Sequence, residues 1–441
     1  MNRIIPLAAA ATLFSGTLPW TSLHGPLAAQ QVSDSLTVEQ AVQRVLATHP
    51  AVREAENGVS ASEARVQVKQ SLFSPTVVAQ GSYSRIGPTP TLDFNGESFS
   101  LFPADNWDGA LSLQYTLVDG GRRQTAVALA RSFQTSATSN VDAVRSRLAY
   151  QTIDAFYAVL FLQQDLDVQD EQIRALGEHL QIIQGKVEAG TATSFDALTT
   201  QVRIATAKSQ RVDIANALSQ RTIQLRELLG LPADSSVAPV GDFRVDSMDL
   251  NLDSLRTVAL TQRPDVRMAH NAEASAEMGS RLAALADKPG VNLMLSVGAK
   301  NGYVPNINTI KPDFVAGMSV QLPIYQGDRT KSQVRAADAD VTTARSRTTT
   351  LERNIVTAVE QVVAAVRAAR EKIATTDIQV SQATEALALA RTRYLAGVVT
   401  NLDVLDAETV LAQAKLVQLR AHYDLVRNRV QLQQAVGEKV W

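Results

Sequence analysis

The sequence predicts a mainly α-helical protein with two pairs of β-strands, in which each chain contains two tandem structural repeats. Three observations predict this fold class. The two halves of the chain match each other, so that Gly190 and Gly397, for example, lie 207 residues apart in equivalent contexts. Each half changes from a helical period to an alternation of period two and back again. Each half also contains a helical segment much longer than the helices of ordinary globular domains.

Residues 1–29 are predicted to be a secretory signal peptide. Arg3 is followed by an apolar segment from Ile4 to Leu18 and by small residues at Ala28 and Ala29, as such signals are. A short buried helix is the alternative. The chain has no cysteine, which suits an oxidising compartment and removes any lipid acylation site. Its net charge of −2 is spread evenly, which argues against nucleic-acid binding.

The first repeat is expected to span residues 30–230. Helical periodicity covers its start, where Pro50 begins a second helix or kinks the first. Two strands, a very long helix and a shorter helix follow. The predicted elements are helices over 36–73, strands at 75–86 and 106–118, a long helix over 120–189 and a helix over 193–230.

The second repeat is expected to span residues 250–437 with the same plan. Between the repeats, residues 231–249 are rich in Pro, Asp and Ser, which predicts a linker with one short strand. The predicted elements of the second repeat are a helix over 252–287, strands at 290–300 and 313–324, a long helix over 327–396 and a helix over 400–436.

The long segments lack proline, and at ~1.5 Å per residue each helix would be on the order of 100 Å long. Apolar residues recur in them every seven residues, which predicts left-handed supercoiling against neighbouring helices. From Trp107 to Gly230 the offset between repeats stays at 207 residues, which indicates that a common packing partner fixes helix length. The recurring residues are Val159, Leu166, Ile173, Leu180 and Val187, and Val366, Ile373, Val380, Leu387 and Tyr394.

The predicted strands have one apolar, aromatic face and one small, polar face. Trp107 and Leu111 alternate with Ser112 and Gln114, for example. Such strands fit a soluble sandwich or an outer-membrane barrel, and alternation alone does not decide between them. The connections at 86–105 and 301–312 are long and polar, as external barrel loops are.

If the mature chain lies in a membrane, it must cross it as a barrel, because no segment after the signal approaches the ~18 apolar residues of a membrane helix. Four strands cannot close, and a membrane leaves no strand edge unpaired. Closure needs at least about eight strands, so chains must share the barrel. Two chains would give eight strands and three would give twelve. The residues do not choose between dimer and trimer.

A helical hairpin tip from Arg391 to Lys415 occurs twice in the chain. Gly397 is suited to end the long helix, and Thr400 starts the next one with Asp403 at the third helical position, which is a capping box. The first copy has the same residue types in the same places. The matching sets are Gly397, Thr400, Asp403 and Leu405 in the second repeat and Gly190, Thr193, Asp196 and Leu198 in the first.

This order of elements resembles the TolC family of outer-membrane efflux and secretion channels. The motif Tyr394-x-x-Gly397-x-x-Thr400-x-x-Asp403-Val404-Leu405-Asp406-Ala407 is similar to the second hairpin tip of that family. The similarity covers nearly all of the mature chain.

The resemblance implies a homotrimer, with a twelve-stranded β-barrel in the bacterial outer membrane joined to an α-helical barrel that crosses the periplasm. It implies a passive exit duct for small toxic molecules, as in multidrug resistance, or for secreted polypeptides. The implied partners are a periplasmic adaptor (membrane fusion) protein, an inner-membrane pump of the RND or ABC type and outer-membrane lipid. No cofactor is implied. Many members carry a lipid on an N-terminal cysteine, which this chain lacks. The alternative is a periplasmic coiled-coil scaffold without a pore.

No catalytic or metal-binding pattern stands out. The five histidines are scattered without ligand spacing, so the chain is not expected to be an enzyme or to bind a metal. Gly120 and Gly121 precede Arg122 and resemble an anion-binding glycine turn. Because an acid, Asp328, replaces the second glycine in the other repeat, a plain strand-to-helix turn is favoured.

Asp403 and Asp406 are predicted to share a helix face, so three subunits would place a ring of carboxylates at the pore entrance. Capping alone explains Asp403, whereas Asp406 corresponds to Thr199 in the first repeat and needs another explanation. Tyr394 matches a family position that contributes to contacts between hairpins. Val399 occupies the place of a basic partner for Asp403, which argues against a salt-bridge latch there. The residues shared by both tips would build the turns and the adaptor-docking surface.

Overall fold

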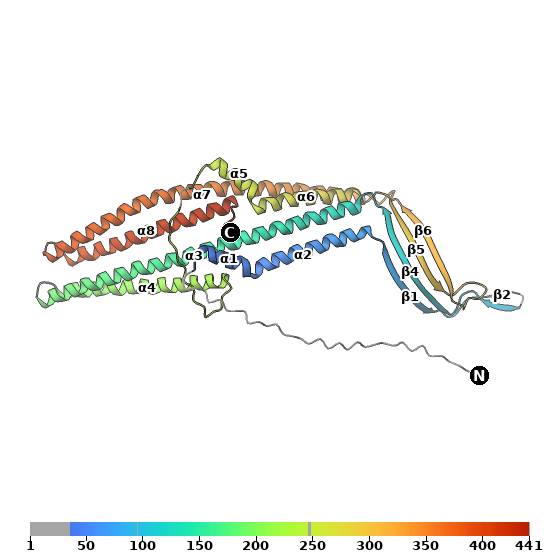
Figure 1. The fold of residues 1–441 in the computed structure, drawn as a ribbon, viewed down its shortest axis with the longest axis horizontal. Helices are drawn as coiled ribbons and strands as arrows, with labels where there is room; N and C mark the ends of the chain where they lie inside the picture. The colour runs from blue at the N-terminus through green and yellow to red at the C-terminus, as the bar shows by residue number, and fades with distance from the viewer. Residues whose placement is uncertain (1–35, 95, 246–247, 441) are drawn as a thin grey trace, which may run out of the picture.

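The computed structural model describes residues 36–94, 96–245 and 248–440. The molecule is elongated, with helical hairpin tips at one end and a β-sheet at the other (Figure 1). None of the helices in these ranges combines the length and the hydropathy that crossing a bilayer requires.

The first repeat opens with two short helices. Helix α1 (Val38–Thr48) starts at a capping box between Thr37 and Gln40, and α2 (Pro50–Gln70) starts directly after it. Pro50 occupies the first position of α2, where its missing N–H costs nothing, so the proline begins a second helix. A short 3₁₀ turn, η1 (Ser71–Phe73), leads to the sheet.

In the second repeat the single helix expected over 252–287 is wrong. The structure has α5 (Leu252–Gln262) and α6 (Pro264–Ala284), with the break at Arg263. The residue before a proline is pushed out of the helical region, and Arg263 accordingly has an extended backbone. Pro264 therefore acts as Pro50 does.

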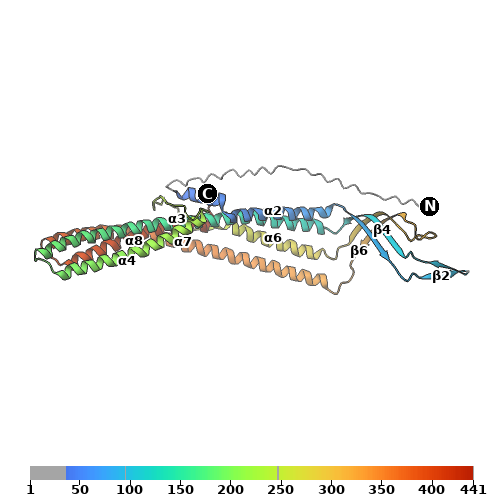
Figure 2. The ribbon, with the colours of Figure 1, turned by 90° about the horizontal axis from the view of Figure 1, so that it is seen from below.

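The two long helices are α3 (Arg122–Glu188) and α7 (Arg329–Leu395), and each has 67 residues. Each forms an antiparallel hairpin with the helix that follows it, α4 (Ser194–Leu228) or α8 (Asn401–Val436). Figures 1 and 2 show α2 beside α3 and α6 beside α7 in the half nearer the sheet. Helix α3 also packs against α6 and α8, which joins the two repeats.

The apolar cores lie where helices of one repeat meet near the middle of the molecule. Val45, Phe156 and Leu225 belong to one cluster, and Val359 and Leu432 belong to its counterpart in the second repeat. Together the clusters hold the short N-terminal helix of each repeat against its long helix.

The predicted seven-residue stripe is buried unevenly in a single chain. Val366, Leu387 and Tyr394 of α7 are buried, but most of the α3 stripe beyond Val159 is only half-buried. The stripe of α3 that is fully buried near the tip is offset and contains Leu176 and Ile183. The predicted seven-residue spacing recurs in both helices, and in α3 the most buried stripe lies three residues further along than the predicted one.

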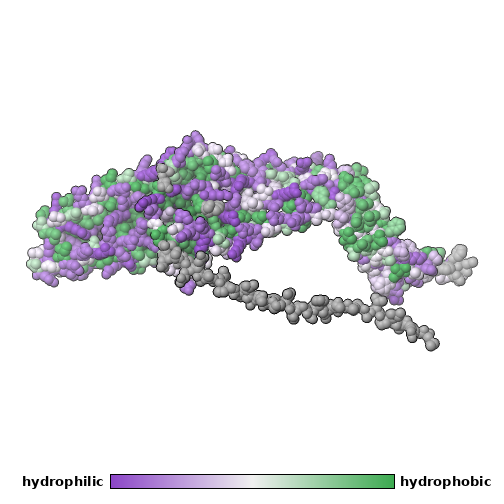
Figure 3. All heavy atoms as spheres, in the orientation of Figure 1, coloured by the Kyte–Doolittle hydropathy of each residue, from purple (hydrophilic) through white to green (hydrophobic). Residues whose placement is uncertain are grey.

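The sheet contains β1 (Thr76–Arg85), β4 (Asp105–Val118), β5 (Gly290–Lys300) and β6 (Lys311–Gln321) in that spatial order, all antiparallel. The register of the sheet places apolar residues opposite apolar residues and polar residues opposite polar residues. Leu111 lies opposite Ala79 and Val297, whereas Thr116 lies opposite Asn292. One face is thus apolar and exposed over the strands, where Figure 3 shows hydrophobic atoms gathered.

The connection over 86–105 contains a structure that the sequence did not predict. A hairpin of β2 (Thr91–Phe94) and β3 (Glu97–Ser100) extends beyond the sheet, turning at Gly96 with a φ of 86°. Beneath it, the rings of Tyr83 and Trp107 lie 4.5 Å apart. The strand expected over 313–324 is shifted: β6 starts at Lys311, which lies opposite Lys300, and ends at Gln321, which lies opposite Gly290.

The linker between repeats packs onto the helices. Leu36 forms a parallel bridge with Pro239, through hydrogen bonds from Leu36 N to Ala238 O (3.0 Å) and from Val240 N to Leu36 O (2.9 Å). Phe243 is buried against Leu160. The linker therefore lies against the helices near the middle of the helical part.

Candidate functional site

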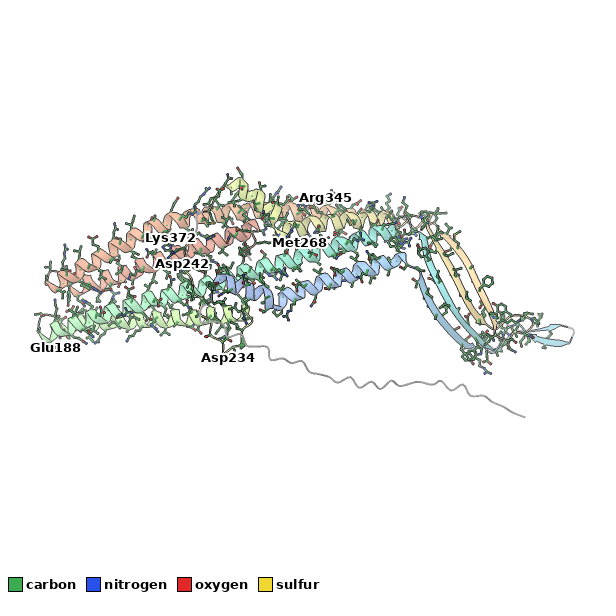
Figure 4. All side chains as sticks on the ribbon, viewed as in Figure 1. Glu188, Asp234, Asp242, Met268, Arg345 and Lys372 are labelled. Atoms are coloured by element: carbon green, nitrogen blue, oxygen red, sulfur yellow. The ribbon has the colours of Figure 1, made fainter. Side chains whose placement is uncertain are left out.

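The two hairpin tips lie at the end of the molecule opposite the sheet, where Figure 4 labels Glu188, the last residue of α3. Both turns use a glycine at positive φ, 72° for Gly190 and 76° for Gly397. In the second turn, Val398 N donates to Arg393 O (2.9 Å) and Gly397 N donates to Tyr394 O (3.1 Å). The first turn has the equivalent bonds, so both helices end in a Schellman motif.

A reciprocal capping box starts the helix after each turn. Asp403 Oδ2 accepts from Thr400 N (2.7 Å) and Thr400 Oγ1 (2.6 Å), while Asp403 N donates to Thr400 Oγ1 (3.3 Å). Thr193 and Asp196 repeat this arrangement. The hydrogen bonds from Thr400 lower the pKa of the Asp403 carboxyl. Capping thus accounts for both of these aspartates.

Apolar side chains project from the tips. Phe195 is 73% exposed, Val398 is 71% exposed, and Leu198 and Leu402 are also exposed. Leu405 differs from its repeat counterpart Leu198, because it is fully buried against Leu176 and Ala207. Of the residues predicted for adaptor docking, Leu198 lies on the surface and Leu405 does not.

Tyr394 lies between the two hairpins. Its ring is 7% exposed and packs with Ile183 and Val404. Lys186 Nζ donates to Tyr394 O (2.8 Å) and lies 4.1 Å from the centre of the tyrosine ring. Burial raises the pKa of the Tyr394 hydroxyl. Tyr394 therefore holds the hairpins of one chain together.

A buried polar network beside Tyr394 was missed by sequence reasoning. Asn401 Nδ2 donates to Asp196 O (3.1 Å) and Thr200 Oγ1 (3.3 Å), which leaves its Oδ1 to accept from His179 Nε2 (2.8 Å). The network joins α3, α4 and α8. Burial lowers the pKa of the His179 imidazole, against the opposing effects of Asn401 and Glu408.

Two ion pairs complete the site. Asp406 Oδ1 lies 3.4 Å from Arg203 Nη2, so the partner of this aspartate comes from the other hairpin. Arg391 binds Glu408, which is 3% exposed, and Arg391 Nε lies 3.1 Å from Glu408 Oε1. The Arg391–Glu408 pair borders a cavity of about 400 Å³ between α3, α7 and α8. Sequence reasoning missed this pair, whose members lie four residues before the end of α7 and seven residues after the start of α8.

Residues 41–231 and 255–438 match the family model described as outer membrane efflux protein. The chain belongs to the outer membrane efflux protein family. This confirms the resemblance drawn from the tip motif. The match is interrupted only at the linker between the two repeats.

Relatives within the efflux protein family match most of the chain. Outer membrane efflux protein BepC of Brucella suis is 24% identical and covers 98% of this chain and 90% of its own. Alkaline protease secretion protein AprF of Pseudomonas aeruginosa is also 24% identical, over 73% of this chain and 67% of AprF. The outer membrane protein VceC of Vibrio cholerae has a similar structure, with a TM-score of 0.79 and 18% identity over 92% of this chain and 97% of VceC. The predicted two-repeat fold is thereby confirmed.

The chemistry of the site in this efflux protein family member is polar contact and ion pairing. In the ranges that the structure describes, no group of three or more His, Asp or Glu side chains could hold a metal ion. In this structure the site holds the two hairpins of one chain together.

Proposed function

We propose that the chain is the outer-membrane channel of a tripartite efflux or secretion system, working as a homotrimer and as a passive exit duct without catalysis. The observation that carries the proposal is the four-stranded sheet, which is apolar on one exposed face, polar on the other and open at both edges.

The open edges require neighbours. Strands β1 and β6 each pair on one side only among the described residues. Unpaired strand edges do not occur within a bilayer, so β6 of one chain would pair with β1 of the next. Three chains give a closed barrel of twelve strands, large enough for a water-filled interior. The apolar face would contact outer-membrane lipid and the polar face would line the duct.

The end of the molecule that carries the hairpin tips would bind partner proteins on the inner side of the periplasm. The exposed apolar residues of the tips, including Phe195 and Val398, would meet a periplasmic adaptor protein, which would connect the duct to an inner-membrane pump of the RND or ABC type. Residues 1–29, proposed as a signal peptide, lie outside the described residues. Without a cysteine to acylate, the barrel alone would hold the chain in the membrane.

The hairpin tips would form the gate of the duct, with Asp406 as its charged group. The Asp403 carboxylate is hydrogen-bonded within its capping box and Tyr394 is buried, whereas the Asp406 side chain is 60% exposed. The gate hypothesis therefore rests on Asp406, with Arg203 as the contact that opening would break. A ring of three Asp406 carboxylates would attract cations.

Fractionation and gel migration test the duct itself. We expect the chain in the detergent-soluble outer-membrane fraction, with migration that changes on heating, as barrels show. A periplasmic scaffold would show neither. Adaptor and pump genes beside this one would tell efflux from polypeptide secretion, the two activities for which BepC and AprF are named.

Single-channel recording tests the acidic gate. Asp406→Asn should weaken the block of current by multivalent cations in planar bilayers, by about tenfold in blocking concentration if the three carboxylates act together. Asp196→Asn, at the capping position of the first tip, is the matched control and should leave the block unchanged. Equal block in all three proteins would refute the gate.

A further inference from the structure

A cleft of about 640 Å³ lies where the sheet meets the long helices, at the junction seen in Figure 1. Both repeats contribute to it. Its walls include strand residues of the polar face, Thr116, Asn292 and Gln321, and the first residues of the two long helices. If the polar face lines the duct, the cleft opens into the duct. The inference below rests on the proposed function in this respect.

The cleft is positively charged. Its lining contains one acid, Asp119, and four bases, Arg122, Arg123, Lys288 and Arg329. Asp119 and Arg123 neutralise each other, because Asp119 Oδ2 accepts from Arg123 Nε (3.0 Å) and from the Arg123 backbone N–H (2.7 Å). Three cations remain.

Within the part of the chain that the structure describes, these three cations have no protein partner. The side chains of Arg122, Lys288 and Arg329 are exposed, and none of them forms a hydrogen bond or ion pair with another residue of the described ranges. Asp119 makes no hydrogen bond or ion pair with them, and its other oxygen accepts from Gly121 N (3.1 Å). The glycine turn itself binds no anion, because this acid occupies its N–H groups.

The position of the two arginines is electrostatically unfavourable and occurs twice. Arg122 and Arg329 are the first residues of α3 and α7 and lie 207 residues apart, at equivalent places in the repeats. A helix N-terminus carries a partial positive charge and normally attracts acids. Neither helix has an acid in its first turn, although the Asp119 carboxylate accepts from the Arg123 N–H at the start of α3 and Asp328 is the N-cap residue of α7. The helix dipole itself adds no stabilisation to an arginine at either place.

The third cation is Lys288, whose first side-chain carbons pack against the backbone of Gly120. Gly120 has a φ of 66°, and a Cβ built on it would lie 2.4 Å from the Cβ of Lys288. The turn before α3 therefore packs directly on the stem of Lys288, which comes from the other repeat. This contact fixes the position of the first side-chain carbons of Lys288 beside the turn.

We propose that this cleft, defined by Arg122, Lys288 and Arg329, binds oxyanions, and that it gives the duct a site for solutes with clustered phosphate or carboxylate groups. Guanidinium groups pair with such oxyanions through two parallel hydrogen bonds. Three chains would place three such clefts at one level of the duct. Solutes would meet an acidic region at the tips and a basic one at the sheet.

Calorimetry with sodium triphosphate on the purified full-length chain at low salt tests the site. We expect binding by the native chain and at least about tenfold weaker binding by the Arg122→Gln/Arg329→Gln variant, since each lost bond involves a charged group. Lys69→Gln, an exposed unpaired lysine at the end of α2 outside the cleft, should bind as the native chain does. Circular dichroism and heat-dependent migration show whether the double variant has folded.

Absent binding by the native chain, or equal binding by the folded double variant, would overturn the proposal. Current block by triphosphate in planar bilayers then places the site in the duct. A chain that binds triphosphate through these residues but forms no pores would keep the site and refute the duct.

Discussion

The two hairpin tips have the same turns and different interiors. Both use a positive-φ glycine and a Thr–Asp capping box. Between their helices, however, Arg391 and Glu408 of the second tip correspond to Gln184 and Gln201 of the first, at the constant offset of 207 residues. The shared residues build a shape, and the unshared ones attach one hairpin to the other and set the charge.

The largest expected effect comes from breaking the buried pair of the second tip. Arg391→Gln leaves the Glu408 carboxylate buried without a cation, and we expect a loss of about 2 kcal/mol in the free energy of unfolding, reduced by the partial exposure of Arg391. Urea unfolding in detergent, followed by circular dichroism, measures it.

The double variant Arg391→Gln/Glu408→Gln is the control, because it gives the second tip the neutral pair of the first. It should recover most of the loss, since no unpaired charge remains. A double variant as unstable as the single one would show that the charge is not the cause.

Removing the shared cap should have a smaller and equal effect on both tips. Thr400→Ala and Thr193→Ala each delete the side chain that accepts from the third helical N–H, and we expect each to cost about 1 kcal/mol. Hydrogen exchange of peptides from each tip measures the local loss. Unequal losses would mean that the caps differ in function as well as in surroundings.

Breaking the contact between the tips should cost less still. Arg203→Gln removes an exposed ion pair with Asp406, which is worth ~0.5 kcal/mol or less. Stability should barely change, while the fraction of time that single channels stay open should rise. A large loss of stability would indicate that Arg203 has a structural role.

The smallest expected effect is a loss of folding stability at low pH, which arises from His179. Because the pKa of His179 is lowered in the folded chain, the unfolded chain binds a proton more readily, so stability is full above the ordinary histidine pKa of ~6.5 and falls as the pH drops below it. We expect a lower melting temperature at about pH 5.5 than at about pH 7.5, and a smaller difference in His179→Gln. An unchanged difference would exclude His179 as the source.

Local patterns predicted the fold well, because each repeat confirms the other. Contacts within one hairpin were only partly within reach: chain order places Arg391 and Glu408 in one hairpin, but they lie four and seven residues from the helix ends beside the turn, so counting does not pair them. Contacts between hairpins were not, since the pairing of Arg203 with Asp406 depends on how two independent hairpins rotate against each other. The same rotation determines that Leu405 is buried while Leu198 is exposed.

The open edges of the sheet have a consequence for how the protein forms. The helical half has its own apolar clusters within one chain, whereas β1 and β6 leave their outer backbone groups unpaired among the described residues. If neighbouring chains complete the sheet, as proposed above, that step would depend on concentration and would come late. A chain already in place would then present a strand on which the next could order its own, so assembly would be a form of templated folding.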